Sequence, residues 1–428
     1  MVISYRDPEV AQWVSSGVSP QQIREKLEAA GTLTFKALSS GLFSAVHVRD
    51  VDDDPTGYGS AWVRDNVHIA NALYQVDQRP AAIDCADALV RYFVTQAPRF
   101  RSAIALGRAP ESVNDRPHIR FDGERLRDLP GSWAHAQNDA LGYFLWLVAR
   151  MVENGDLPDS PPTMDTLALV VGYLSAIAYW QDADSGHWEE ERKVCSSSIG
   201  TVVAGLRAVR ACRAPALSEA LGAMGIDEAK LDSLIKKGND ALMKRLPAES
   251  IDVYPRQEDS ALLFLIEPLR VVEVDSPVGK AILRGVADRL TGAHGIRRYR
   301  RDSYWAPDFR QWQGGQDPST EDEYRLARDR IAVDGQEAQW ALFDPILCVI
   351  HARSSAEDAA DRRNFHFQRS LAQLTGPNDS PGRLRCVEAY FLERSKWVAN
   401  DHVPLLWTQA NLLLALDAMS AAFEASVD

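Results

Sequence analysis

Cysteine and long hydrophobic runs are scarce in this sequence, and each scarcity excludes a class of protein. The five cysteines are odd in number, widely spread and form no Cys-x-x-Cys pair, so neither a disulfide framework nor a zinc site is indicated. The longest apolar run, Leu167 to Trp180, holds about 14 residues, fewer than the roughly 20 that span a bilayer. Arg6, Asp7 and Glu9 stand where a signal peptide would be apolar. We therefore expect a cytoplasmic protein with reduced, mostly buried thiols.

Basic residues are outnumbered, with 47 Lys and Arg against 60 Asp and Glu and a net charge of −13. Nucleic acids and anionic membrane surfaces would be repelled, so we expect neither as a partner. No His-x-x-x-His or EF-hand spacing is present, and we expect no metal and no other cofactor. A neutral or cationic ligand fits this charge better, and the sequence leaves the oligomeric state open.

Helical periodicity dominates the chain, in segments of roughly 12 to 20 residues separated by Pro, Gly and Asp clusters. This pattern predicts an all-α fold of about 11 to 13 helices. The predicted segments are 21–30, 67–76, 80–95, 139–152, 163–180, 198–212, 217–246, 260–269, 277–289, 337–352, 357–374 and 404–427. Segments that are apolar on nearly all sides alternate with charged amphipathic ones, which favours two concentric layers. No Pro-, Ser- or Gly-rich linker divides the chain, so we expect one domain over 1–428, with 1–57 packed on its outside as a helix and a loop.

The stretch 185–198, SGHWEEERKVCSSS, places three adjacent carboxylates after a Trp. One interpretation is a solvated helix start, where acidic groups in the first turn favour the exposed N–H groups. The other is one wall of a sugar-binding cleft, because an aromatic ring stacks on the apolar face of a pyranose and carboxylates accept its hydroxyl protons. In this second interpretation Trp188, Glu189 and Glu190 face the ligand.

Three further loops combine an aromatic with charged side chains. Residues 58–65, YGSAWVRD, lead into a helix expected near Asn66, and residues 130–139, PGSWAHAQND, lead into a buried one. Residues 295–309, GIRRYRRDSYWAPDF, form the third. Simple capping or a solvated basic turn would explain each loop alone. A sugar clamp by charge-assisted hydrogen bonds is the functional alternative.

The C-terminal stretch 387–407, VEAYFLERSKWVANDHVPLLW, offers Glu388 and Glu393 among aromatic residues. A single glutamate is weak evidence, because cleavage of a glycosidic bond calls for two carboxyl groups, one protonated and one ionised. The stretch therefore indicates a catalytic site only if it is paired with one of the glutamates at 189–191.

In their order along the chain, the four aromatic and charged loops at 58–65, 130–139, 185–198 and 295–309 resemble the glucoamylase-type glycoside hydrolases (glycoside hydrolase family 15) and the related phosphorylase kinase α/β subunits. The resemblance covers roughly Trp62 to the C-terminus. It implies an (α/α)6 toroid, or six-hairpin barrel, with a pocket formed by loops at the ends of the inner helices. It also implies release of β-glucose with inversion.

Site residues follow from the resemblance position by position. Trp188-Glu189-Glu190 is similar to the family's WEE motif, which implies that Glu189 is the general acid and Glu190 a substrate contact. Glu388, 19 residues before Trp407, looks like the general base, with Glu393 as the alternative base. The family's Pro before this glutamate is Val387 here. The remaining substrate-binding positions implied by the resemblance are Trp62, Arg64, Asp65, Trp133, Trp188, Arg298, Asp302 and Trp407.

The sequence therefore predicts an inverting, exo-acting α-glucosidase. No β-sandwich or starch-binding module is expected, so a small oligosaccharide or α-glucoside is a better substrate than granular starch. A non-catalytic, phosphorylase-kinase-like toroid that binds glycan or protein and regulates another enzyme is the alternative. Burial beside Trp188 and the neighbouring glutamates is expected to raise the pKa of Glu189.

Overall fold

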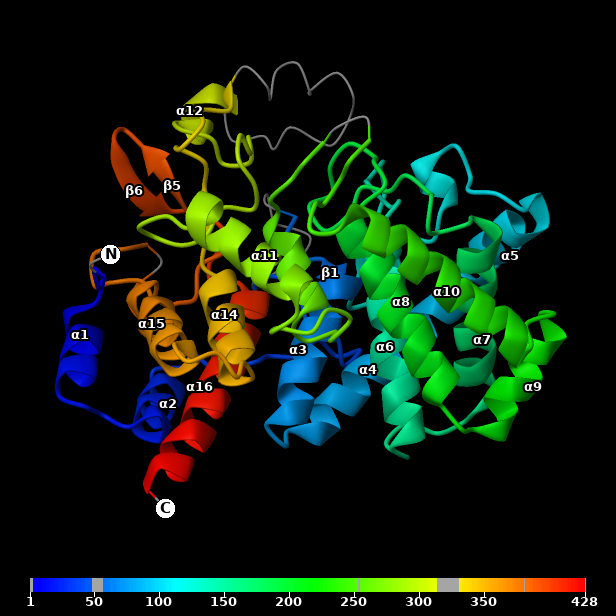
Figure 1. Ribbon diagram of the computed structural model, residues 1–428, viewed down its shortest axis with the longest axis horizontal. Coiled ribbons are helices and arrows are strands. Elements are labelled where there is room, and N and C mark those ends of the chain that lie inside the picture. Colours follow the sequence, from blue (N-terminus) through cyan, green and yellow to red (C-terminus); the bar gives the residue numbers. More distant parts are fainter. Residues whose placement is uncertain (1–2, 48–56, 253–254, 314–330, 381, 428) are drawn as a thin grey trace.

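The computed structural model describes residues 3–47, 57–252, 255–313, 331–380 and 382–427, and the fold within them is helical. Six inner segments form a closed ring in which each contacts the next and the last returns to the first. The inner members are α3 (Val63–Gln75), α6 (Asn138–Glu153), α8 (Ser196–Ala211), the 3-10 helix η2 (Ser260–Leu265), α14 (Phe343–Ala352) and α16 (Leu406–Val427). In Figure 1 the C-terminal α16 lies beside α3, which closes the ring.

Six outer helices alternate with the inner ones along the chain and pack against them. They are α2 (Pro20–Ala29), α4 (Arg79–Thr95), α7 (Pro161–Ala176), α10 (Glu228–Arg245), α11 (Pro277–Gly285) and α15 (Ala359–Ala372). The expected all-α (α/α)6 toroid is thereby confirmed. The inner helices α3, α6 and α8 are buried on nearly every side, whereas α2 and α10 bury one stripe only. The apolar segment 163–180, expected in the inner layer, is instead the outer helix α7.

Shorter elements decorate the toroid. The additional helical segments are α1 (Pro8–Ser15), α5 (Ala97–Leu106), η1 (Val113–Asp115), α9 (Pro215–Ala223), η3 (Val286–Leu290) and α12 (Phe309–Gln313). Two three-stranded antiparallel sheets join loops near the ends of inner helices. They consist of β1 (Ala61–Trp62), β2 (Arg120–Asp122) and β3 (Arg127–Asp128), and of β4 (Gln339–Trp340), β5 (Ala389–Glu393) and β6 (Lys396–Ala399).

Several element predictions were wrong in detail. The expected helix 217–246 is broken into α9 and α10, because Gly225 adopts a left-handed φ of 69° and Asp227 caps a new helix through Lys230 N at 2.7 Å. The helix expected from 337 begins only at Phe343, after β4, and α3 begins three residues before Asn66. Helices α1 and α5 and the six strands were not predicted. Very short strands carry too few residues for an alternating pattern to stand out.

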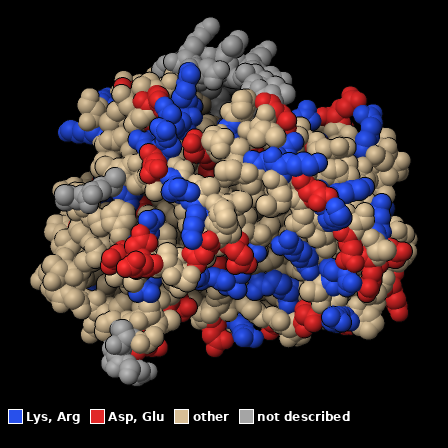
Figure 2. Space-filling view, in the orientation of Figure 1, with Lys and Arg blue, Asp and Glu red and all other residues tan. Residues whose placement is uncertain are grey.

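The five cysteines are free and buried, as predicted. Figure 2 shows Lys and Arg interspersed with Asp and Glu on the face in view. Among the described residues, no helix combines the length and apolar character needed to cross a membrane. Helix α2 packs against α16 and α1 against α15, while residues 48–56, part of the segment 1–57, lie outside the described residues. The assignment of one domain to 1–428 stays a prediction.

Candidate active site

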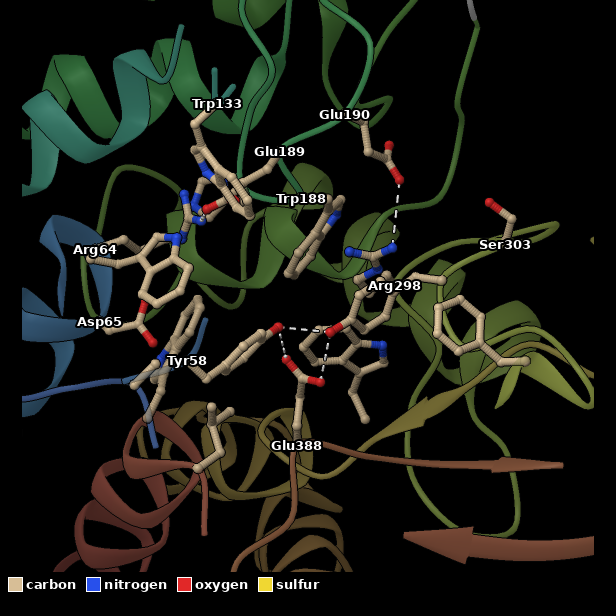
Figure 3. A pocket seen from close by; sticks show the side chains of 18 residues that line it. Tyr58, Arg64, Asp65, Trp133, Trp188, Glu189, Glu190, Arg298, Ser303 and Glu388 are labelled. Carbon is tan, nitrogen blue, oxygen red and sulfur yellow. Dashed lines mark hydrogen bonds and ion pairs between the residues drawn. The ribbon is translucent and has the colours of Figure 1, made fainter. Parts of the chain in front are cut away.

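A pocket of about 170 Å³ lies at the end of the toroid where the inner helices begin. Its lining residues come from loops far apart in sequence (Figure 3). They are Ala45, Tyr58, Trp62, Arg64, Asp65, Trp133, His187, Trp188, Glu189, Glu190, Arg298, Ser303, Tyr304, Phe309, Trp340, Glu388, Leu405 and Trp407.

Glu189 lies on one side of the pocket in a tight turn, not in the first turn of a helix, because α8 begins only at Ser196. The solvated-helix-start interpretation is therefore wrong. The backbone of Glu189 has a left-handed φ of 57°, which costs a non-glycine residue about 1 kcal/mol or more. Its carboxylate accepts Arg64 Nη2 at 3.1 Å and Trp133 Nε1 at 2.8 Å. The surrounding structure thus holds this side chain at the pocket in spite of the backbone strain.

Burial raises the pKa of Glu189, although Arg64, the nearby Arg120 and the Trp133 N–H act in the opposite direction. The direction matches the expectation, but its cause does not include the neighbouring glutamates. Trp133, and not Trp188, is the indole that contacts this carboxylate. The Trp188 N–H instead bonds Asp259 Oδ1 at 2.8 Å.

Glu388 lies on the opposite side of the pocket from Glu189, directly before β5, and its carboxylate points into the pocket (Figure 3). Tyr58 Oη donates to Oε1 at 2.9 Å. Tyr304 Oη, at 3.0 Å, and Asn400 Nδ2 donate to Oε2, and His402 Nδ1 is 2.8 Å from the same oxygen. Burial alone would raise the pKa of Glu388, but the charge and hydrogen bond of His402 and the bonds from Tyr58 and Asn400 lower it overall.

Asp65, in the first turn of α3, lines the pocket together with Glu189 and Glu388. Burial raises its pKa to about 7, with Glu189 and Glu388 both adding to the rise and Arg64 opposing it. Asp65 is therefore close enough to both glutamates to feel their charge. The adjacent Arg64 is itself held by Asp139 at 2.7 Å and Gln137 at 3.0 Å, both from the start of α6.

Arg298 and Glu190 form a second charged wall. Arg298 Nη2 lies 3.6 Å from Glu190 Oε1, and Arg256 Nη2 donates to Glu190 Oε2 at 2.8 Å. Asp302, predicted to grip the sugar, is fully buried and does not line the pocket. It takes two hydrogen bonds from Arg298, at 2.6 and 2.7 Å, and so orients that arginine from behind.

Four predicted tryptophans meet at the pocket. Trp62 and Trp133 pack edge to face at 6.2 Å between centroids. Trp407, in the first turn of α16, stacks on His68 at 4.5 Å, and its indole N–H is buried without a hydrogen-bond partner within the described part of the chain. Trp188 packs on Trp340, with centroids 5.8 Å apart. Aromatic surfaces beside buried carboxylates suit a sugar ring.

Sequence reasoning missed Tyr58, Tyr304, Trp340 and His402 as members of the site. Tyr58, Tyr304 and His402 come from loops and Trp340 from β4, and their places depend on long-range packing. Closeness in sequence to Trp62, Arg298 and Trp407 could have suggested the first three, whereas Trp340 has no such neighbour. The alternative base, Glu393, does not line the pocket, and Arg310 Nη1 binds its carboxylate at 2.7 Å. No group of three or more His, Cys, Asp or Glu side chains suited to a metal ion occurs within the described ranges.

Comparisons with known proteins found both regulatory subunits and glycosidases. The chain is 26% identical over 402 residues to a probable phosphorylase b kinase regulatory subunit alpha of Caenorhabditis elegans, a match over 82% of this chain and 30% of that protein. The chain thus spans less than a third of that relative. A glycosidase variant solved in complex with glucose matches with a TM-score of 0.59 and 20% identity, over 92% of this chain and 95% of that one. The glucoamylase of Saccharomycopsis fibuligera gives 0.58 and 13%, over 95% and 96%.

These structural identities are low and establish the shared toroid alone. The family model of the glycosyl hydrolases family 15, however, matches residues 29–313, which is more than half of the sequence. The chain therefore belongs to glycosyl hydrolases family 15.

Proposed function

We propose that this protein is an inverting, exo-acting glycoside hydrolase that releases β-glucose from the non-reducing end of a small α-glucan or α-glucoside. One observation carries the proposal. Glu189 and Glu388 face the same pocket from opposite sides, and their pKa values are displaced in opposite directions. A raised pKa favours the protonated form of one carboxyl and a lowered pKa favours the ionised form of the other, which is the asymmetry that glycosidic bond cleavage requires.

In the proposed reaction Glu189 donates its proton to the leaving glycosidic oxygen. Glu388 takes a proton from a water molecule that attacks the anomeric carbon from the other face of the ring. Inverting enzymes leave room for this water by keeping the two carboxyl groups roughly 6.5–9.5 Å apart. The product then has the opposite anomeric configuration, so an α-linked substrate yields β-glucose.

The remaining lining residues bind and orient the sugar in this proposal. Arg64 and Asp65 on one wall and Arg298 and Glu190 on the other offer charged donors and acceptors for hydroxyl groups. Trp133 and the other lining tryptophans supply apolar surface for the ring. A pocket of about 170 Å³ lined by these side chains favours a small sugar in this proposal.

The test is a substrate panel followed by NMR of the anomeric protons. Maltose, isomaltose, trehalose and longer glucans are incubated with the protein, and early release of β-glucose, before mutarotation, is expected for at least one of them. Glu189→Gln and Glu388→Gln should each lose at least about a hundredfold in kcat, since general acid and base catalysis each contribute about 10² to 10⁴. Glu393→Gln is the matched control, since this glutamate faces Arg310 outside the pocket lining, and it should keep the activity.

The second candidate function is a non-catalytic toroid that binds glycan or a protein and regulates another enzyme. The match to a regulatory subunit of phosphorylase b kinase over 82% of this chain favours it. No turnover on the whole panel, together with glucose or maltose binding measured by calorimetry, would support this candidate and contradict the hydrolase. Release of α-glucose would contradict inversion alone.

A further inference from the structure

His402 is a buried histidine whose ring is fixed against the proposed base. Nδ1 of His402 is 2.8 Å from Glu388 Oε2, and the ring lies flat on that of Tyr58, with centroids 3.5 Å apart and planes 12° apart. Trp305 packs on it edge to face at 5.7 Å. The backbone fixes the same pair, because Glu388 N donates to His402 O at 3.2 Å. The imidazole therefore has little freedom to leave the carboxylate.

The two oxygens of Glu388 have unequal surroundings. Oε2 has Asn400 Nδ2, His402 Nδ1 and Tyr304 Oη around it, whereas Oε1 accepts the hydroxyl of Tyr58. A carboxylate oxygen offers about two lone pairs, so Asn400 and the Nδ1–H tautomer of His402 suffice to saturate Oε2, with Tyr304 beside them. Oε1 can therefore accept a further hydrogen bond from a group in the pocket.

We propose that His402 is the positioning residue of the base: it holds Oε2 of Glu388 through Nδ1, so that Oε1 is the oxygen that receives the proton of the attacking water. This assignment rests on the proposed hydrolase function and goes beyond it by naming the atom and the side chain that fixes it. It does not make His402 a catalytic residue, since its contact is with Glu388.

The proton balance of the step is complete without another reactant. One O–H bond of the water breaks and its proton passes to Oε1, while the water oxygen bonds to the anomeric carbon. The bond from that carbon to the leaving oxygen breaks, and this oxygen takes the proton of Glu189. Both carboxyl groups return to their starting states by exchange with solvent after the product leaves.

The groups facing Glu388 set the sign of the pH effect. Tyr58, Tyr304 and His402 come from three different loops, and Asp65 from α3, whose pKa is raised to about 7, is the other titratable group that interacts with Glu388. His402 lowers the pKa of Glu388, so removing the imidazole must raise that pKa. The base would then be protonated at a higher pH, and the acid limb of the kcat/KM profile would move upward.

The test compares two substitutions. His402→Phe keeps a flat ring on Tyr58 but has no N–H, and His402→Asn keeps an N–H near the place of Nδ1 but loses the ring. We expect His402→Phe to move the acid limb up by about one pH unit, a loss of about tenfold in kcat/KM below the limb. His402→Asn should move it less. His351→Phe is the matched control, because His351 is equally buried and stacks on His366 at 5.5 Å away from the pocket lining.

A titration of Glu388 keeps this inference separate from the proposed function. In protein labelled with 13C at the glutamate carboxyls, the Glu388 signal is assigned by its loss in Glu388→Gln. Its titration should shift upward in His402→Phe whether or not any substrate turns over. If His402→Phe does not fold, an upward shift in His402→Asn supports the proposal. An unchanged Glu388 titration and acid limb in the folded variants, with or without lower kcat, would overturn it and leave His402 a packing residue.

Discussion

Trp133 donates its indole N–H to Oε2 of Glu189 at 2.8 Å, while Arg64 binds the other oxygen at 3.1 Å. The two donors come from the loop before α6 and from the first turn of α3, so two inner helices converge on one carboxylate. Both favour its ionised form, in opposition to burial. The pKa of Glu189, the proposed acid, thus depends on opposing effects, and a single substitution can change it.

Trp133→Phe removes one of these two donors and keeps an aromatic ring. The pKa of Glu189 should rise further, because a hydrogen bond to its charged form is lost, and a loss of about 1.5 kcal/mol corresponds to about one pH unit. The proposed acid would stay protonated to higher pH, so the basic limb of the kcat profile should move upward. The pH–rate profile measures this shift. Trp146→Phe, outside the pocket lining, is the control, and a basic limb that stays in place would contradict the prediction.

Asp302→Asn tests whether Asp302 orients Arg298 for sugar binding. This substitution removes the negative charge that orients the guanidinium, and we expect the affinity for glucose to fall about tenfold, the cost of one charge-assisted hydrogen bond. Calorimetric titration with glucose gives the dissociation constant. The exposed pair of Arg300 and Asp334 offers a matched control, so Asp334→Asn should leave glucose binding unchanged. Equal affinities in the wild type and Asp302→Asn would show that Asp302 does not support sugar binding.

Asp344 joins the start of α14 to α15 and makes stability depend on pH. Burial would raise its pKa, but Arg369 and His366 lower it to about 2. A carboxyl with a depressed folded-state pKa contributes stability above its unfolded pKa of 3.8, and that stability is lost as the pH falls toward 2. The contribution is about 2 kcal/mol. Asp344→Asn should lower the free energy of unfolding near neutral pH by about 3 kcal/mol, because buried Arg369 loses its partner.

Thermal unfolding between pH 2 and pH 7 measures this effect. The difference in stability between wild type and Asp344→Asn should shrink as the pH falls below 4. Asp361→Asn, an exposed aspartate on α15, is the control and should follow the wild type. A difference that stays constant over this pH range would contradict the linkage.

Gly142→Ala probes a close contact between two helices of the inner ring. A methyl group at this position of α6 would lie 2.6 Å from the backbone of Thr201 and Val202 on α8, so the helices must move apart. Overpacking of this kind costs about 1–3 kcal/mol, and the melting temperature should fall by several degrees. Gly222→Ala on α9 meets nothing within 4 Å and should be neutral or slightly stabilising. Equal melting temperatures of the two variants would show that the ring yields at this contact.

Prediction from the sequence succeeded where the signal is local. The long apolar segments around α6 and α7 carry a helical period, so their existence and burial could be predicted. The same reasoning predicted a helix over 260–269, but the structure has the short 3-10 helix η2 there. Periodicity shows which residues are apolar, but it does not distinguish the hydrogen-bond pattern of an α-helix from that of a 3-10 helix. The site residues came from motifs within single loops. The interactions of Asp302 with Arg298 and of Glu388 with His402 depend on side-chain directions that no motif states.

The sequence by itself determined the alternation of buried and amphipathic helices, the family, and the loops that carry Trp62, Trp133, Glu189 and Arg298. The hydrophobic period and the order of the residues are properties of the chain, and they do not depend on the conformation of the loops. The tertiary structure decided that Glu189 accepts a hydrogen bond from Trp133, that Glu388 is surrounded by hydrogen-bonding partners, and that Glu393 binds Arg310. A pKa depends on burial and on charges brought together from distant loops, so the distinction among these glutamates exists only in the folded toroid.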